Sequence, residues 1–285
     1  MKQKRVLTIQ DYSCLGRCSL TEYLPVVSSC GIECVGIPTA VLSNHTAGFR
    51  SWTYADLTEY LLPTIDHWED YNHFFDAISS GYLGTNQVDI VSQIFRRLKT
   101  EKTILLVDPA FADSGRLYPG FTKDHIDKMR TLLSLADVTL PNLTEACLLT
   151  GTPYREDFSL PEIDRMMEKL SSFGPKEVVI SGLSLSKGKV GCRILDSRTK
   201  TFSTYQTKSY PGQYHGTGDL FASSFLSARV LGLGLSSSVE VAHDFVHRSI
   251  KETIEEGKPE LYYGVEFEKA LPYLVRKIKN QLSKG

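Results

Sequence analysis

The chain has 285 residues, of which 32 are basic and 33 acidic, so its formal net charge is -1. This balance argues against binding to nucleic acid or to an acidic membrane through bulk electrostatics, and a small-molecule partner is expected instead. No linker or charge block divides the chain, so we expect a single domain over residues 1–285. No apolar stretch is long enough to cross a bilayer, and we therefore expect a cytoplasmic protein.

Short apolar runs rich in β-branched residues alternate with longer amphipathic stretches. This alternation is typical of an α/β domain with a mainly parallel sheet, and the last two strands predict an antiparallel hairpin. The predicted strands are 5–9, 33–38, 75–80, 103–107, 138–140, 177–181, 190–196 and 201–208. The predicted helices are 19–30, 87–100, 122–136, 143–150, 161–173, 219–231, 236–255 and 265–282.

Two features of the sequence could suggest zinc. Cysteines at 14 and 18 and at 30 and 34 repeat a C-x3-C spacing, and His243 and His247 share a helical face. The second cysteine pair straddles Gly31, and the histidine pair lacks a third ligand, so we favour structural roles for both. The six cysteines are expected to be reduced.

The run Gly216-Thr217-Gly218-Asp219 joins a glycine-rich loop to a predicted helix. The unpaired N–H groups at such a helix start can hold phosphate oxygens, and Asp219 beside them could accept a proton. Asp219 alone could equally be an early-turn carboxylate that the helix dipole favours. The complete run, followed by the small residues Ala222, Ser223 and Ser224, favours an anion-binding helix start with an acid beside it. The chain has no P-loop and no dinucleotide fingerprint.

The segment 216–222, Gly-Thr-Gly-Asp-Leu-Phe-Ala, resembles the signature of the ribokinase superfamily, and within it that of the pyridoxal kinases. Segments 40–48, 80–84, 107–109 and 140–146 resemble further motifs of that family, in the same order. The resemblance implies a ribokinase-like three-layer α/β/α sandwich with a mainly parallel central sheet and a late antiparallel hairpin. It also implies transfer of the ATP γ-phosphoryl group to the 5′-hydroxymethyl group of pyridoxal, pyridoxine or pyridoxamine.

The resemblance assigns roles to residues that bind ATP. Asp219 is the expected base, beside an anion hole of Gly216, Thr217 and Gly218. The expected ATP-binding residues are Asp108, Asn142, Glu145, Ser181 and Lys208, with Asp108 and Glu145 acting on Mg²⁺ through water and Asp113 assisting. Independently of the family, Asn142 and Glu145 could form a helix capping box. A monovalent cation such as K⁺ and a homodimer are further family expectations.

The resemblance also predicts a substrate pocket. The expected contacts are Val41, Ser43, His45, Thr46 and Tyr82, although a lone histidine such as His45 is more often a structural hydrogen-bonding group. Segments 40–50 and 111–121 are the predicted covers of the site.

The chain departs from the family at Asp11, where pyridoxal kinases usually have a serine that meets the substrate. We hypothesise that Asp11 accepts a hydrogen bond from the ring or pairs with an amine, which would favour pyridoxamine or pyridoxine over the aldehyde.

Two other functions compete with a B6 kinase. A hydroxymethylpyrimidine kinase would use the same Gly-Thr-Gly-Asp chemistry with a different pocket, and segment 43–46, Ser-Asn-His-Thr, argues against it. A non-catalytic binding protein on the same fold would be expected to lose Asp219 or the phosphate loop, and both are present.

Overall fold

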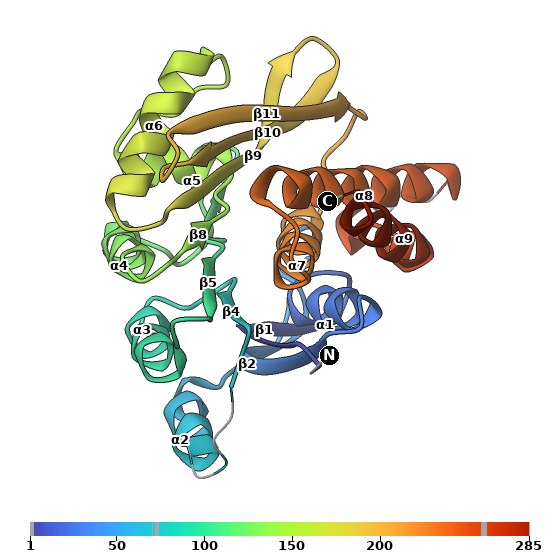
Figure 1. Cartoon of the computed structure of the whole chain (residues 1–285). Helices are drawn as coiled ribbons and strands as arrows, with labels where there is room; N and C mark the ends of the chain where they lie inside the picture. Colours follow the sequence, from blue (N-terminus) through green and yellow to red (C-terminus); the bar gives the residue numbers. More distant parts are fainter. Residues whose placement is uncertain (1–2, 70, 72–73, 258–260, 285) are drawn as a thin grey trace. The chain divides into compact units, whose positions relative to one another are not determined.

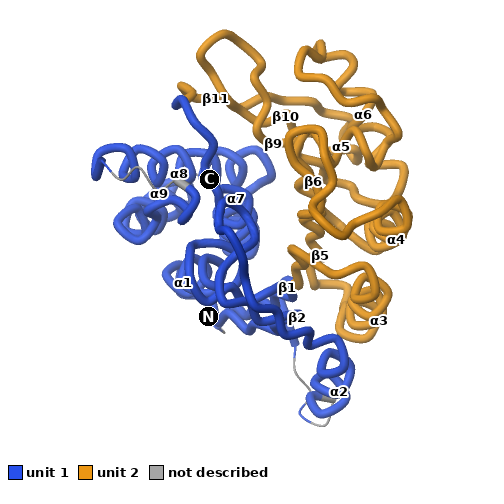
Figure 2. The backbone as a smooth tube through the Cα atoms, turned by 180° about the vertical axis from the view of Figure 1, so that it is seen from behind, with its two compact units in different colours: residues 1–77, 210–285 blue, residues 78–209 orange. Residues whose placement is uncertain are grey.

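The computed structural model describes residues 3–69, 71, 74–257 and 261–284. The chain forms two compact units, one of residues 1–77 and 210–285 and one of residues 78–209 (Figure 2). The first unit is therefore built from both ends of the chain. A single domain over residues 1–285 stays a prediction.

The first unit contains a mixed sheet and the C-terminal helices. Its strands are β1 (Arg5–Leu15), β2 (Glu33–Asn44) and β3 (Tyr54–Asp56). Its helices are α1 (Leu20–Ser29), α2 (Thr58–Glu69), α7 (Thr217–Val230), α8 (Leu235–Glu255) and α9 (Leu271–Leu282), with the 3-10 turns η1 (Leu261–Tyr263) and η2 (Glu268–Ala270). Strand β1 pairs in parallel with β2, and β2 pairs antiparallel with β3.

The pairing of β1 with β2 is irregular at Asp11. Gln10 pairs with Pro38 and Tyr12 with Val41, so Asp11 stands opposite two residues of β2, and the extra residue of this bulge belongs to β2. Asp11 is only 5% exposed although it stands among polar neighbours. Strand β1 continues to Leu15, well beyond the predicted end at residue 9.

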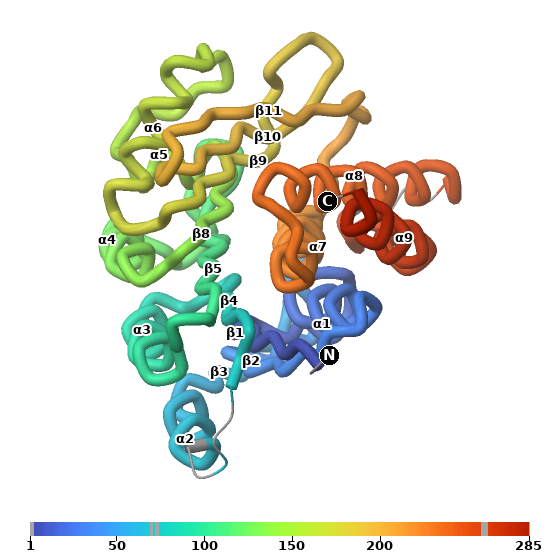
Figure 3. The backbone as a smooth tube through the Cα atoms, viewed as in Figure 1, coloured from blue at the N-terminus to red at the C-terminus, as the bar shows by residue number. Residues whose placement is uncertain are grey.

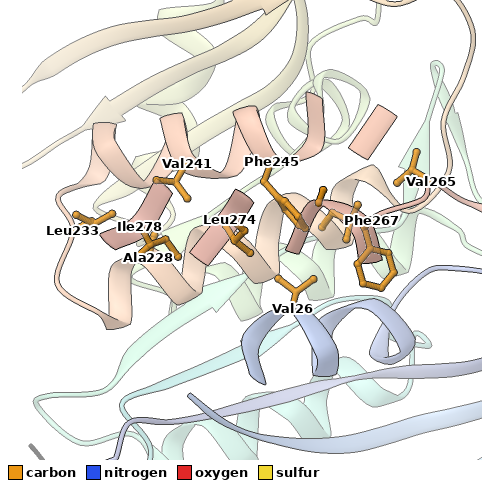
Figure 4. Packing of buried hydrophobic residues seen from close by; sticks show 11 residues of the cluster. Val26, Ala228, Leu233, Val241, Phe245, Val265, Phe267, Leu274 and Ile278 are labelled. Atoms are coloured by element: carbon orange, nitrogen blue, oxygen red, sulfur yellow. The ribbon is translucent and has the colours of Figure 1, made fainter. Parts of the chain in front are cut away.

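The helices of the first unit enclose one apolar cluster, shown in Figure 4. Its buried side chains come from α1, α7, α8 and α9, from the loop between α7 and α8, and from η2 and the segment before it: Val26, Leu220, Ala228, Leu233, Val241, Phe245, Val265, Phe267, Ala270, Leu274 and Ile278. Helix α7 contacts α1 and α8, and α9 contacts α8 (Figure 1). This packing fixes the direction in which the N-terminus of α7 points.

Helix α7 is buried although it contains three serines. Ser223, Ser224 and Ser227 each donate a hydrogen bond to the carbonyl four residues earlier, over 2.7, 2.5 and 2.7 Å. Their hydroxyls are thus satisfied inside the helix and need no outside partner. Polar residues can therefore occupy a helix that is packed on all sides.

The second unit contains most of the sheet's strands, which Figure 3 follows along the chain. Its main strands are β4 (Ala77–Ser80), β5 (Ile104–Val107), β8 (Val138–Thr139), β9 (Glu177–Ser186), β10 (Lys189–Asp196) and β11 (Thr201–Lys208), in the order β11-β10-β9-β8-β5-β4. Strands β6 (Ala112–Asp113) and β7 (Arg116–Leu117) form a separate pair. The helices are α3 (Gln87–Leu98), α4 (Lys123–Leu133), α5 (Leu143–Thr150) and α6 (Leu160–Ser172).

The pairings confirm the predicted fold class. Strands β5, β8 and β9 run parallel, whereas β9, β10 and β11 run antiparallel as the predicted hairpin requires. Several predictions were wrong in detail. Strands β2 and β9, like β1, extend beyond their predicted ends at residues 38 and 181. Helix α2 was missed, and α7 begins at Thr217 rather than at Asp219. The last helix begins at Leu271 rather than at residue 265, because Pro272 favours the first turn of a helix.

Candidate active site

The N-terminus of α7 is shaped by two glycines. Gly216 is the N-cap with φ of 80° and ψ of -10°, a left-handed conformation that favours glycine. A Cβ atom there would lie 2.5 Å from both the Arg17 carbonyl oxygen and Glu22 Oε1. Apart from its chain neighbours and the nearby backbone of α7, no described atom lies within 4 Å of a Cβ built at Gly218. The predicted anion hole is therefore tightly supported behind Gly216 and open at Gly218.

Asp219 lies in the first turn of α7 and is partly buried. Its Oδ2 accepts a hydrogen bond from the Ser19 backbone N–H over 2.8 Å. Burial raises the pKa of Asp219 to about 7, the Ser19 hydrogen bond opposes that rise, and the negative charge of Asp11 adds to it. The carboxylate is consequently a much better base near neutral pH than an ordinary aspartate, whose pKa is about 3.9.

Asp11 is held by two serine hydroxyls. Its Oδ1 accepts from Ser19 Oγ over 2.5 Å, and its Oδ2 accepts from Ser13 Oγ over 2.9 Å. Burial raises the pKa of Asp11, and the two serine bonds oppose that rise. Because Asp11 is only 5% exposed, little of it is open to a ligand, and its predicted substrate role and vitamer preference stay predictions.

Glu22 is a buried acid that the sequence did not single out. It lies in α1, is fully buried, and neither carboxyl oxygen has a hydrogen-bond partner among the described residues. Burial, together with the charges of Asp219 and Glu268, raises its pKa well above the ordinary value, while Arg17 opposes the rise. Glu22 therefore keeps its proton where an exposed glutamate would have lost it.

Arg17 fastens the loop between β1 and α1 to the C-terminal segment. Its backbone N–H donates to the Tyr263 carbonyl over 2.8 Å. Its guanidinium donates to Glu268 Oε1 over 2.9 Å and to Glu266 Oε1 over 3.2 Å. These contacts hold the loop that carries Ser19 against the segment 263–268.

His45 is a buried residue beside the anion hole. Its ring packs edge-on against Phe49 at 4.9 Å between centroids and lies 6.0 Å from the ring of His215, the residue before Gly216. Burial lowers the pKa of His45, and the neighbouring His215 lowers it further. His45 is thus neutral at physiological pH and can both shape the pocket and donate one hydrogen bond.

The other predicted substrate residues are spread along β2 and the loop after it. Val41 is half-buried, Ser43 is exposed within the strand, and Thr46 is exposed in the loop. Ser43 Oγ donates to Asn44 Oδ1 over 2.8 Å and accepts from the Thr53 N–H over 3.0 Å. Tyr82 belongs to the second unit, where its ring packs against Phe121 at 5.4 Å between centroids.

Asn142 and Glu145 form the capping box of α5, as the local reading predicted. Glu145 Oε2 accepts from the Asn142 N–H over 2.9 Å, and Oε1 accepts from the Phe111 N–H over 2.9 Å and the Ala112 N–H over 3.4 Å. Burial raises the pKa of Glu145 to about 7, against the effect of these hydrogen bonds. A carboxylate with three N–H partners has little capacity left for a metal ion.

The donors present fit Mg²⁺ only through water. Among the described residues, no group of three His, Cys, Asp or Glu side chains is arranged to hold a metal ion. Asp108 follows β5 and is half-buried, and Asp113 is exposed with its Oδ1 accepting from the Ser114 N–H over 2.7 Å. Such a sparse set suits an ion held mainly by substrate phosphates and waters. Metal roles for Asp108 and Glu145 stay predictions.

Ser181 lies on β9 and Lys208 at the end of β11. Ser181 bridges to Asn142 in parallel fashion, and its N–H donates to the Pro141 carbonyl over 3.2 Å. Lys208 is exposed and pairs with Lys189, which pairs with Ser186 well beyond Ser181 on β9. The structure therefore groups Ser181 with Asn142 and Glu145, but not Lys208.

Each unit thus collects part of the predicted site. The first unit joins Asp219 and the anion hole to Asp11 through Ser19, with His45 beside them. The second unit joins Ser181, Asn142 and Glu145. Ser19 and Glu22 were not predicted from the sequence. Ser19 ends the Gly-Arg-Cys-Ser loop, 16–19, and Glu22 follows three residues later, so this loop was the one signal that could have drawn attention to them.

Comparisons with known proteins agree with this geometry. The phosphomethylpyrimidine kinase family model matches residues 24–262, so the chain belongs to that family, which is ribokinase-like. The chain is 26% identical over 269 residues to the hydroxymethylpyrimidine/phosphomethylpyrimidine kinase of Staphylococcus aureus, covering 90% of this chain and 92% of the relative.

Two solved structures share the fold over nearly the whole chain. A Bacteroides thetaiotaomicron protein assigned as a phosphomethylpyrimidine kinase, in a crystal form with pyridoxal, has a TM-score of 0.91 and 31% identity, covering 96% of each chain. The pyridoxal kinase of Lactobacillus plantarum has a TM-score of 0.89 and 28% identity, covering 97% of this chain and 98% of its own. These similarities confirm the ribokinase-like fold and the resemblance to pyridoxal kinases.

Replacing Glu22 with Gln should change how stability depends on pH. Because the pKa of Glu22 is raised, unfolding releases its proton above pH 4.5, and wild-type stability falls by about 1.4 kcal/mol per pH unit until the folded pKa is reached. A glutamine side chain does not ionise, so the stability of the variant does not fall with pH for this reason. Thermal unfolding should therefore show a stability advantage of the variant that grows between pH 5 and pH 8.

The exposed Glu101 provides the control, because Glu101→Gln removes a carboxyl group from the surface. An advantage of Glu22→Gln that is the same at both pH values would contradict the buried, protonated state of Glu22.

Proposed function

We propose that the protein is an ATP-dependent kinase that phosphorylates the 5′-hydroxymethyl group of a B6 vitamer, pyridoxal, pyridoxine or pyridoxamine. The observation that carries this proposal is Asp219 in the first turn of α7, with a pKa of about 7 and the backbone N–H groups of Gly216, Thr217 and Gly218 beside it. A base and an anion hole within one helical turn are what phosphoryl transfer to an alcohol needs.

The chemistry follows from these groups. The Asp219 carboxylate accepts the proton of the substrate hydroxyl, and the alcohol oxygen forms a bond to the γ-phosphorus. The bond between that phosphorus and the β–γ bridging oxygen breaks, and ADP leaves with the electron pair. The first N–H groups of α7 donate to the phosphoryl oxygens while charge spreads over them.

The choice of substrate rests on the pocket segment and on the relatives. Val41, Ser43, His45 and Thr46 follow the order expected for a pyridine pocket, and the relative at 31% identity was crystallised with pyridoxal. The relative at 26% identity and the family model favour hydroxymethylpyrimidine as the second candidate. Both substrates present a hydroxymethyl group on a nitrogen heteroaromatic ring, so Asp219 would serve either.

Other parts of the proposal follow from the family. ATP would be the phosphoryl donor, Mg²⁺ would bind with it near Asp108 and Glu145, and K⁺ is a further candidate ion. A homodimer in the cytoplasm is the expected form of the enzyme. No helix in the described part of the chain has the length and apolar character to cross a membrane.

The function is tested by incubating the protein with Mg-ATP and, separately, with each of the three vitamers and hydroxymethylpyrimidine. Mass spectrometry should detect a monophosphate of at least one vitamer, with a higher kcat/KM than for the pyrimidine. A higher value for hydroxymethylpyrimidine would replace the proposal by the second candidate, and no transfer to any substrate would favour a binding protein.

Asp219→Asn should lower kcat by a factor of about 10² to 10⁴, the usual contribution of a general base. In the wild-type protein, kcat/KM should fall about tenfold per pH unit below pH 7, because the carboxylate must be deprotonated to accept the proton. Steady-state kinetics between pH 5 and pH 9 measures both effects.

The matched control is Asp127→Asn, which changes an exposed acid of α4. A flat wild-type profile between pH 5 and 7, or an Asp219→Asn variant as active as Asp127→Asn, would rule out Asp219 as the base.

A further inference from the structure

Ser19 donates hydrogen bonds to two acids of the first unit, Asp11 and Asp219. Its backbone N–H donates to Asp219 Oδ2 over 2.8 Å, and its Oγ donates to Asp11 Oδ1 over 2.5 Å. Asp11 comes from β1 where its register with β2 shifts, Ser19 is the N-cap residue of α1, and Asp219 lies in the first turn of α7. The side chain and the backbone of one residue therefore connect three elements.

The backbone of Ser19 adopts a conformation that serine avoids. Its φ is 49° and its ψ is -133°, a combination that glycine adopts easily and that strains residues with a Cβ atom. Strain of this kind persists only where surrounding contacts hold it. The Ser19 side chain is 6% exposed, and the hydrogen bond to Asp11 is the contact that its Oγ makes.

The strained conformation has a direct consequence for Asp219. The direction of a backbone N–H is set by the φ and ψ angles around it, so relaxation of Ser19 to a negative φ would turn its N–H away from Asp219. The bond from Ser19 Oγ to Asp11 opposes that relaxation. Ser13 in turn holds the second oxygen of Asp11 over 2.9 Å, so the acceptor itself cannot rotate freely.

We infer that Ser19 is a positioning residue for Asp219, and that Asp11 acts in the reaction by holding Ser19 rather than by touching the substrate. This inference rests on the proposed function of Asp219 as the base. Holding Ser19 is a role that Asp11 can fill from its buried position. The pair Asp11 and Ser19 sets where the carboxylate of Asp219 stands when it meets the hydroxyl.

The test compares alanine with glycine at position 19. Ser19→Ala removes Oγ but leaves the strain, so the loop relaxes and kcat should fall at least tenfold with little change in KM. Ser19→Gly also lacks Oγ, but glycine adopts the positive φ without strain, so it should recover most of the activity that alanine loses. Asp11→Ala should resemble Ser19→Ala, and the double alanine variant should lose no more than either single one.

Lys200 supplies the matched control for backbone strain. It has φ of 55° in the turn between β10 and β11, so Lys200→Ala and Lys200→Gly repeat the same pair of changes away from the site. Neither should change kcat. Equal losses in Ser19→Ala and Ser19→Gly, or no loss in Ser19→Ala, would overturn the positioning role.

A second readout does not depend on activity. In ¹H–¹⁵N NMR spectra recorded across pH, the amide signal of residue 19 should follow the titration of Asp219 in the wild type and in Ser19→Gly, but not in Ser19→Ala. If the wild type transfers no phosphate to any substrate, the proposed function fails while this titration still tests the positioning. An amide signal that ignores the Asp219 titration in the wild type would overturn the positioning even in an active kinase.

Discussion

The hydrogen bond from the Ser19 N–H to Asp219 joins residues 200 positions apart in the chain. The geometry of the candidate site at the start of α7 depends on this bond, because it fixes the Asp219 carboxylate relative to the N–H groups of the same helical turn. The bond is held on one side by Asp11 and on the other by the packing of α7 against α1. Catalytic geometry in this unit is thus a property of the loop between β1 and α1 as much as of the glycine-rich run.

A second feature of the first unit is a group of buried carboxyl side chains. Asp11, Glu22 and Asp219 all have raised pKa values, and burial is the largest cause in each case. Together they oppose the binding of anionic phosphate if all are ionised. A protonated Glu22 directly behind Gly216 removes one of these charges, while Asp219 remains able to change its protonation state near neutral pH.

Local patterns in the sequence predicted much of the fold but only part of the site. The alternation of apolar runs placed the main strands, and the Asn142 and Glu145 spacing predicted a capping box that the structure contains. In the sequence, Glu22 is an acid in the first turn of a helix, where such residues are common. Nothing in the neighbouring residues indicates that Gly216 packs against its carboxyl group. The strain at Ser19 is equally invisible, because it results from contacts between segments distant in the chain.

Asp219 is held in a desolvated position, and burial raises its pKa to about 7. Labelling the aspartate carboxyl carbons with ¹³C and recording NMR spectra from pH 4 to pH 9 tests this directly, with the Asp219→Asn variant assigning the signal. A midpoint near pH 7 is predicted. A midpoint near pH 4, the value of an exposed aspartate, would contradict the account.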